Sequence, residues 1–192
     1  MAIGSFSLSD DLISTIKNQG FSFNSEPIAF SALVGISASK IGLVFNDSLN
    51  YYVLNSDQAT VKYLEKKGCK NIFGINTLPS LFEYLNKNIS AIGIVNLYSL
   101  NQYKTKFGWQ DSILKIMPYK TQDKITFPNQ VDIANGNYPG YLPINFLLKK
   151  AQIDEEERFL KFLFQRDGQK IFQKEGLAPL LNYERNIEIN KE

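Results

Sequence analysis

The sequence predicts an α/β fold, because strand patterns and helix patterns alternate along the chain. Residues 28–37 and 91–97 are runs of apolar and small residues, which are typical of buried strands. A third strand pattern, at residues 51–54, is followed by a helix pattern, and a second helix pattern precedes residues 91–97. Parallel strands require crossover helices of this kind, so the order of the patterns indicates a sheet with helices packed on it.

The composition is that of an ordinary globular protein and excludes some classes of function. The chain has 192 residues, of which 44% are apolar, and 21 Lys and Arg against 19 Asp and Glu give a net charge of +2. With about 150 residues in a typical domain, this length fits one full domain or two small lobes. A nucleic-acid partner needs a clustered basic excess, whereas the basic residues here are scattered, so no nucleic acid is expected as a partner.

The chain contains no histidine, which removes much catalytic and metal chemistry. Ser-His-Asp and Cys-His nucleophilic systems, HExxH zinc proteases and imidazole metal sites all need that side chain. The single cysteine, Cys69, cannot form a disulfide within the chain, and we interpret it as an inert small side chain rather than a reactive thiol. No metal and no cofactor are expected.

The N-terminal part is predicted to hold one helix and two strands. Ser9 is a good N-cap for a helix over about residues 9–19, and Gly20 can end this helix. The buried strand at residues 28–37 follows. A second strand is predicted at residues 41–46.

Two helices are predicted in the middle of the chain. Residues 55–57 are capping residues for the first helix, and Gly68 can terminate it. The second helix is predicted over residues 79–87, with Thr77 near its start. Its apolar face consists of Leu81, Phe82 and Leu85.

The C-terminal part begins with the least regular pattern of the chain. Residues 99–140 contain a single predicted strand, at residues 113–117, and an apolar run follows at residues 143–148. Two helices then close the chain, the first from Asp154 and the second ending at Gly176. The side chains predicted to face inward are Phe159, Leu160, Phe162 and Leu163 on the first helix and Ile171 and Phe172 on the second.

Five segments of the C-terminal half follow one another in a distinctive order: N-G-N-Y-P at residues 135–139, L-P-I-N-F-L-L-K-K at 142–150, E-R-F-L-K-F-L at 157–163, G-Q-K-I at 168–171 and K-E-G-L-A-P-L at 174–180. In order and spacing they resemble the phosphate-binding proteins of ABC transporters. Further matches lie at residues 82–85, 90–95, 26–30 and 8–17. The resemblance therefore covers nearly all of the chain and is weakest from residue 99 to 130.

The resemblance implies the α/β fold of type II periplasmic binding proteins, in which crossing strands join two lobes around a ligand cleft. It implies a first lobe from residues 1–40 and 136–192 and a second lobe from residues 41–135. Family members also carry an earlier strand, a phosphate loop rich in glycine and serine, and a helix, and they carry a further stretch between the positions of Lys40 and Ile41. The first lobe is therefore expected to be incomplete, and the chain to be a fragment or a shortened relative.

The candidate ligand-binding residues are Ser5, Ser56, Asp57, Gln58 and Thr60. An anion is favoured at a helix N-terminus by unpaired N–H groups and by the helix dipole, and this helix start is similar in position to the phosphate loop of the family. Thr60 matches the threonine of that loop, and Ser56 or Gln58 stands where a donor is expected. The arginine and the glycine of the loop are absent.

Structural alternatives exist for Ser5, Ser56 and Asp57. Ser56 or Asp57 would then only cap a helix, and the segment around Ser5 would be only a turn. Without the arginine, a phosphate would lose a bidentate, charge-assisted contact worth about 1.5–3 kcal/mol per hydrogen bond. The choice between ligand site and helix cap stays open at the level of the sequence.

The resemblance implies a non-enzymatic binding domain for a small oxyanion, with phosphate as the first candidate, that delivers its ligand to an ABC permease. The alternative is a module that has lost ligand binding and acts as a structural or protein-interaction unit, with a protein partner or a second copy covering the incomplete lobe. An enzyme is not expected, because the carboxylate groups at Asp10 and Asp11 and at residues 155–157 lie in first helical turns, where the helix dipole explains them.

An exported location, in the periplasm or cell envelope, is implied by the resemblance alone. Residues 28–39 imitate the apolar core of a signal peptide. They lie far from Met1 and have no basic segment directly in front, so we interpret them as a buried strand and expect no signal peptide in this chain. No stretch reaches the roughly 18 uncharged apolar residues that span a bilayer.

Overall fold

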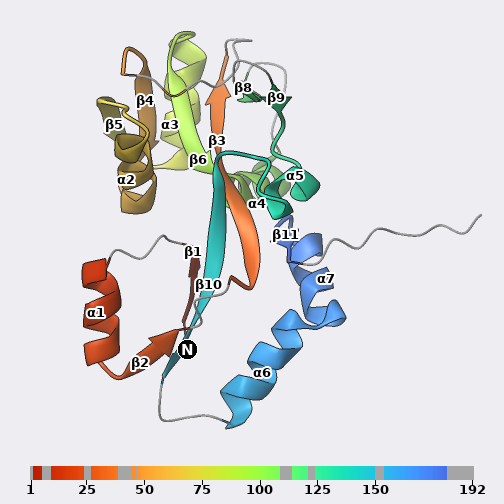
Figure 1. Ribbon diagram of the computed structural model, residues 1–192. Coiled ribbons are helices and arrows are strands. Elements are labelled where there is room, and N and C mark those ends of the chain that lie inside the picture. Colours follow the sequence, from red (N-terminus) through yellow and green to blue (C-terminus); the bar gives the residue numbers. More distant parts are fainter. Residues whose placement is uncertain are drawn as a thin grey trace, which may run out of the picture.

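The computed structural model describes residues 2–5, 10–23, 27–38, 45, 47–108, 114–120, 124–149 and 154–180. Two groups of elements lie at opposite ends of two long strands, β3 (Ala29–Ser37) and β10 (Tyr141–Lys149) (Figure 1). The main sheet has the strand order β1-β10-β3-β6-β4-β5, with β2, β7 and β11 paired to it off this path. The molecule is thus two lobes joined by long strands.

Strand β3 belongs to both lobes. Its first half pairs antiparallel with β10, from Ala29 to Ala32, and its second half pairs antiparallel with β6 (Ile92–Asn96), from Leu33 to Ile36. Nearly all of β3 is buried, which confirms the strand predicted at residues 28–37. A run of small and apolar side chains can be covered on both faces of a sheet, and this strand therefore forms the centre of the molecule.

The first lobe surrounds the far end of β10. It contains β1 (Ala2–Ser5), α1 (Asp10–Asn18), β2 (Phe21–Phe23), α6 (Asp154–Phe164), α7 (Arg166–Lys174) and β11 (Ala178–Pro179). Both β1 and β2 pair antiparallel with β10. The core of this lobe includes Ile28, Phe146 and Leu163.

The second lobe surrounds the far end of β3. It contains β4 (Asn50–Leu54), α2 (Gln58–Lys66), β5 (Asn71–Ile75), α3 (Leu78–Lys87), β6, α4 (Leu97–Phe107), β7 (Lys115–Met117), β8 (Tyr119–Lys120), β9 (Ile125–Thr126) and α5 (Gln130–Ala134). Strand β4 is parallel to both β5 and β6. The two crossover helices α2 and α3 make this parallel pairing possible.

Several predicted elements are confirmed almost to the residue. Helix α1 covers most of residues 9–19, and α3 begins after Thr77, whose hydroxyl accepts a hydrogen bond from the N–H of Ser80 at 3.3 Å. All three predicted apolar residues of α3 are buried. Helix α2 ends before Gly68, which has a φ of 82°, a conformation that favours glycine.

Other predictions are wrong. Residues 99–107 are helical within α4 rather than irregular, and neither β5 nor α5 was predicted. The apolar pattern of α4 is weak, since its buried residues are only Leu97 and Leu100, and the glycine within β5 interrupts the strand pattern. The strand predicted at residues 41–46 falls outside the described residues apart from Phe45.

The two C-terminal helices also differ from prediction in the side chains that they bury. Ile171 is 50% exposed and Phe159 is 38% exposed, although both were predicted to face inward. On α7 the buried positions are Gly168 and Gln169 instead. In the described part of the chain, no helix has the length and apolar character that crossing a membrane requires.

Candidate functional site

The carboxyl ends of β4, β5 and β6 meet at one edge of the sheet, and that edge is directed toward the first lobe. The direction follows from the pairing of β6 with β3, in which Asn96 at the end of β6 lies opposite Leu33, close to the segment of β3 that pairs with β10. Each of these three strands is followed by a helix, α2, α3 or α4. In open α/β sheets, ligands bind outside this edge, where neighbouring strands send their helices in different directions.

The N-terminus of α2 is capped by Asp57. Its Oδ1 accepts a hydrogen bond from the backbone N–H of Thr60 at 3.0 Å, and its Oδ2 accepts one from the Thr60 hydroxyl at 2.5 Å. Thr60 is only 1% exposed. The capping alternative therefore describes the observed geometry of Asp57, and the Thr60 hydroxyl holds the carboxylate in place.

Two backbone donors remain at this helix start. The N–H groups of Gln58 and Ala59 belong to the first turn and have no hydrogen-bond acceptor among the described residues. The side chains of Ser56 and Gln58 are exposed beside them. The N-terminus of α2 thus offers N–H, hydroxyl and amide groups together with one carboxylate.

The start of α4 lies at the same edge and contains a contact that sequence reasoning missed. The Oδ1 atom of Asn96 accepts hydrogen bonds from the N–H of Tyr98 at 2.9 Å and from the hydroxyl of Ser31 at 2.8 Å. Ser31 is a buried residue of β3. The cap of α4 is therefore tied to the strand that joins the lobes, and the sequence signal for it was an asparagine directly after an apolar strand.

The structure brings four of the five candidate residues together. Ser56, Asp57, Gln58 and Thr60 share the start of α2. Ser5 lies in the first lobe, at the end of β1, where it is opposite Ile144 in the antiparallel pair. The four residues of α2 and Ser5 therefore belong to different lobes.

Two tyrosines, one half-buried and one fully buried, hold the region where the lobes meet. The hydroxyl of Tyr63, on α2, donates to the carbonyl of Pro139 at 2.8 Å, and the hydroxyl of Tyr138 donates to the carbonyl of Leu33 at 3.1 Å. Burial raises the pKa of both phenols above the ordinary value of 10.0, so both are neutral donors at physiological pH. Tyr138 is fully buried and acts as a packing residue, whereas Tyr141 is exposed.

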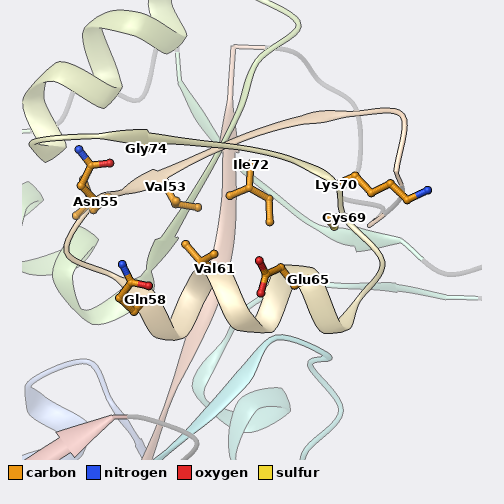
Figure 2. A pocket seen from close by; sticks show the side chains of 10 residues that line it. Val53, Asn55, Gln58, Val61, Glu65, Cys69, Lys70, Ile72 and Gly74 are labelled. Carbon is orange, nitrogen blue, oxygen red and sulfur yellow. The ribbon is translucent and has the colours of Figure 1, made fainter.

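A separate cavity of about 500 Å³ lies between α2 and the strands β4 and β5 (Figure 2). Val53, Val61 and Ile72 form its apolar part, and polar side chains lie toward its ends. These polar side chains are Asn55, Gln58, Glu65 and Lys70.

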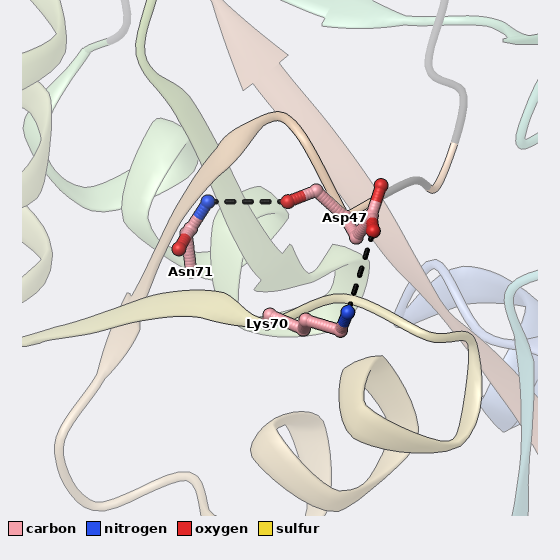
Figure 3. A network of polar contacts seen from close by, with 3 residues as sticks. All are labelled: Asp47, Lys70 and Asn71. Carbon is pink, nitrogen blue, oxygen red and sulfur yellow. Dashed lines mark hydrogen bonds and ion pairs between the residues drawn. The ribbon is translucent and has the colours of Figure 1, made fainter.

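A small polar network holds the loop before β4 against the start of β5 (Figure 3). Lys70 Nζ lies 3.5 Å from Asp47 Oδ2, and the Asn71 side chain donates to the Asp47 carbonyl at 3.2 Å. Both members of the ion pair are largely exposed, so the pair is worth at most about 1 kcal/mol. The network is a structural contact at the end of the cavity.

No protein-family model and no curated protein sequence matches this chain. Solved structures do share its fold. A Clostridium perfringens protein described as a phosphate ABC transporter substrate-binding protein with bound phosphate is 16% identical, with a TM-score of 0.63 over 94% of this chain and 79% of that chain. An ABC-type phosphate transport receptor from Vibrio cholerae is 14% identical, with a TM-score of 0.60 over 92% and 78%.

The fold is shared with proteins that bind other solutes. The GluR0 ligand-binding core, in complex with L-glutamate, is 13% identical, with a TM-score of 0.59 over 91% of this chain and 72% of that chain. At these identities the similarity establishes the architecture and not the ligand. The chain has the two-lobed α/β fold of type II periplasmic binding proteins.

Proposed function

We propose that this chain is a non-enzymatic binding domain that holds a small anion, with phosphate as the first candidate, between its two lobes. The observation that carries the proposal is the start of α2, where the N–H groups of Gln58 and Ala59 have no hydrogen-bond acceptor among the described residues. This helix start lies at the edge of the sheet that is directed toward the first lobe. The phosphate-binding proteins with the same fold support the choice of anion. Delivery to an ABC permease and an exported location are part of the same proposal.

In this proposal the first lobe consists of residues 1–40 and 136–192 and the second of residues 41–135. Ser5 would approach the ligand from the first lobe, and Ser56 and Gln58 from the second. Thr60 acts on the site through Asp57, because its hydroxyl already donates to that carboxylate.

Asp57 bears on which anion is accepted. A carboxylate can only accept hydrogen bonds, so an anion beside it must bring a proton of its own. Phosphate carries a proton near neutral pH, whereas sulfate does not. The geometry of the helix start therefore favours phosphate over sulfate.

Thermal unfolding in the presence of phosphate, sulfate, molybdate, L-glutamate and L-arginine tests the proposal. We expect phosphate to raise the midpoint, since a ligand at 100 times its dissociation constant stabilises the native state by about 2.7 kcal/mol. Sulfate should give no shift at the same concentration. If only an amino acid raises the midpoint, the chain is still a binding domain, but its ligand is that amino acid and not phosphate.

Two variants of one residue separate the backbone donor from the side chain. Gln58 is the first residue of α2, a position where proline is tolerated, so Gln58→Pro removes one N–H without breaking the helix. We expect at least a tenfold loss of phosphate affinity in calorimetry, because a hydrogen bond to a charged group is worth about 1.5–3 kcal/mol. Gln58→Ala keeps the N–H and serves as the matched control. Equal affinities for the two variants would remove this helix start from the site.

The Asp57 carboxylate also supports a second candidate function, in which the chain no longer binds a ligand. Asp57 takes the donors of Thr60, and the arginine and glycine of the resembling phosphate loop are absent. A module that has lost its ligand and acts in structure or protein interaction would show this pattern. The absence of a thermal shift with every compound of the panel would favour that function.

A further inference from the structure

Helices α5 and α7 both pack on β11, α5 from the second lobe and α7 from the first (Figure 1). Helix α5 is anchored by Ile133, which is buried in the core of the second lobe. Helix α7 is anchored by Gln169, whose side chain donates to the carbonyl of Ile28 at the start of β3. The chain passes from the first core to the second between Leu177 and Ala178. The two helices therefore face each other across a boundary between the lobes.

The side chain of Gln130 joins the two helices across this boundary. It belongs to the first residue of α5, and its Nε2 donates to the carbonyl of Gln173 at 2.9 Å and to the carbonyl of Leu177 at 3.0 Å. The Gln173 carbonyl lies in the last turn of α7, which carries the negative end of the helix dipole and favours a donor. Backbone groups of the first lobe thus take both amide hydrogens of one second-lobe side chain.

The backbone that carries Gln130 is held firmly. Asn129 caps α5, because its Oδ1 accepts from the N–H of Asp132 at 2.8 Å and its Nδ2 donates to Asp132 Oδ2 at 2.6 Å. A second bond crosses the same boundary, from Gln102 Nε2 on α4 to Glu175 Oε2 at 3.3 Å. Both of those side chains are exposed, so water competes with that bond, and Gln130 makes the stronger contact.

This contact and the proposed anion site lie on opposite sides of the long strands. In Figure 1, α1 and α2 lie to the left of β3 and β10, whereas α5, α7 and β11 lie to the right. Two lobes that turn about the strands between them approach each other on one side and separate on the other. Closing the first lobe on the start of α2 therefore moves α7 away from α5.

We propose that Gln130 is a latch that holds the lobes apart on the side of α2 and thereby lowers the affinity of the anion site. The effect on affinity rests on the proposed function, whereas the latch rests on the contacts between α5 and α7. Closure over an anion has to break both hydrogen bonds of Gln130, so the observed affinity is lower than that of the closed form alone. Removing the latch should tighten binding although no residue of the anion site changes.

The surroundings of the latch suit a contact that opens and closes. Gln130 is half-buried, and its bond to the Gln173 carbonyl is exposed, so water can replace that bond when the helices separate. Gln169 makes bonds of the same kind in a fully buried position, where separation would leave carbonyls without partners. The bonds of Gln130 are therefore the ones that yield when the lobes turn.

Spin-label distances test the latch without any ligand. Labels at Lys17→Cys on α1 and Lys62→Cys on α2 place one exposed probe on each lobe, in a chain that also carries Cys69→Ala. We expect Gln130→Met, which keeps the length and has no donor, to shift the distances to shorter values. Gln173→Ala is the matched control and should leave them unchanged, because it keeps the carbonyl that accepts the bond.

A second variant makes the test independent of a single substitution. Gln130→Glu keeps the size, has no donor when ionised and is repelled by the carbonyl end of α7, while a carboxylate suits the first turn of α5. We expect it to shorten the distances at least as much as Gln130→Met does. Circular dichroism checks that each variant is folded. Unchanged distances in both Gln130 variants would overturn the latch.

Calorimetry with inorganic phosphate tests the effect on affinity. We expect Gln130→Met to bind phosphate at least about threefold more tightly than Gln173→Ala, because closure no longer breaks two hydrogen bonds. A residue that only stabilised the fold would not raise affinity when replaced, so equal or weaker binding would overturn the proposed control of affinity. If the wild-type chain binds no phosphate, the proposed function fails, and the spin-label distances alone decide whether the latch exists.

Discussion

At the scale of single residues, Gln169 shows how one polar side chain can hold three segments together. It is fully buried, its Nε2 donates to the carbonyls of Ile28 at 3.0 Å and Leu163 at 2.6 Å, and its Oε1 accepts from the N–H of Leu180 at 2.7 Å. These bonds join the start of β3, the end of α6 and the residue after β11. A glutamine fits because its amide offers two donors and an acceptor in one group.

We expect Gln169→Leu to lower the free energy of unfolding by about 2–4 kcal/mol, because it keeps the size and leaves three backbone groups, two of them buried, without their glutamine partner. Urea unfolding measures this change. Gln173→Leu on the exposed side of α7 is the control and should change stability by no more than about 0.5 kcal/mol. If Gln169→Leu changes the free energy of unfolding as little as the control does, water must take over the hydrogen bonds that the glutamine makes.

At the scale of elements, α2 is fixed by contacts at its start, middle and end. Asp57 caps its N-terminus, and Gly68 follows its end. From its middle, Tyr63 contacts the Phe45 ring, with centroids 5.8 Å apart, and donates to Pro139 in the turn before β10. The proposed anion site thus lies at the start of a helix that the turn before β10 holds in place.

The phenol of Tyr63 should make stability depend on alkaline pH. Burial and, to a smaller extent, Tyr119 and Cys69 raise its pKa above the ordinary value of 10.0, so folding favours the neutral form. This stabilisation is complete below pH 10 and is lost as the pH rises toward the folded-state pKa. We expect Tyr63→Phe to lose about 1 kcal/mol at neutral pH and to show a shallower fall in stability above pH 10.

Urea unfolding over the alkaline range measures this effect. Exposed Tyr141 is the control, and Tyr141→Phe should retain the wild-type slope. The slope of Tyr63→Phe should be reduced rather than abolished, because buried Tyr138 contributes in the same direction. An unchanged slope in Tyr63→Phe would assign the alkaline sensitivity to other groups.

At the scale of the whole molecule, β3 is the element on which both lobes depend. It passes from pairing with β10 to pairing with β6, and also pairs with β7 and β11. Leu33, Val34 and Ile36 within it are almost completely buried. Any movement of one lobe relative to the other must be absorbed where this strand and β10 run between them.

We expect amide hydrogen exchange to be slowest in β3, from Leu33 to Ile36, because these amides open only when the sheet itself comes apart. The N–H groups of Ile72 and Gly74 point away from β4 at the outer edge of the sheet and should exchange quickly, because no described group accepts a hydrogen bond from them. Mass spectrometry of exchange-labelled peptides measures both. Rapid exchange throughout β3 would contradict the central role of this strand.

The sequence by itself determined the features that depend on neighbouring residues. Capping residues predicted the starts of α2 and α3, Gly68 predicted the end of α2, and apolar runs predicted β3 and β6. The candidate residues Ser56, Asp57, Gln58 and Thr60 share the start of α2 because they lie within five positions of the chain. Local hydrogen bonds and side-chain periodicity are written within a few residues, so a single sequence is enough to find them.

Only the tertiary structure decided the contacts between distant segments. It placed Gln169 in the core and Ile171 at the surface, showed that β5 is a strand with an open edge, and tied Asn96 to Ser31. It also showed that Asp57 takes the hydroxyl of Thr60, which the sequence left open. These features depend on which groups meet across the fold, because burial and hydrogen-bond satisfaction are set by partners far apart in the chain.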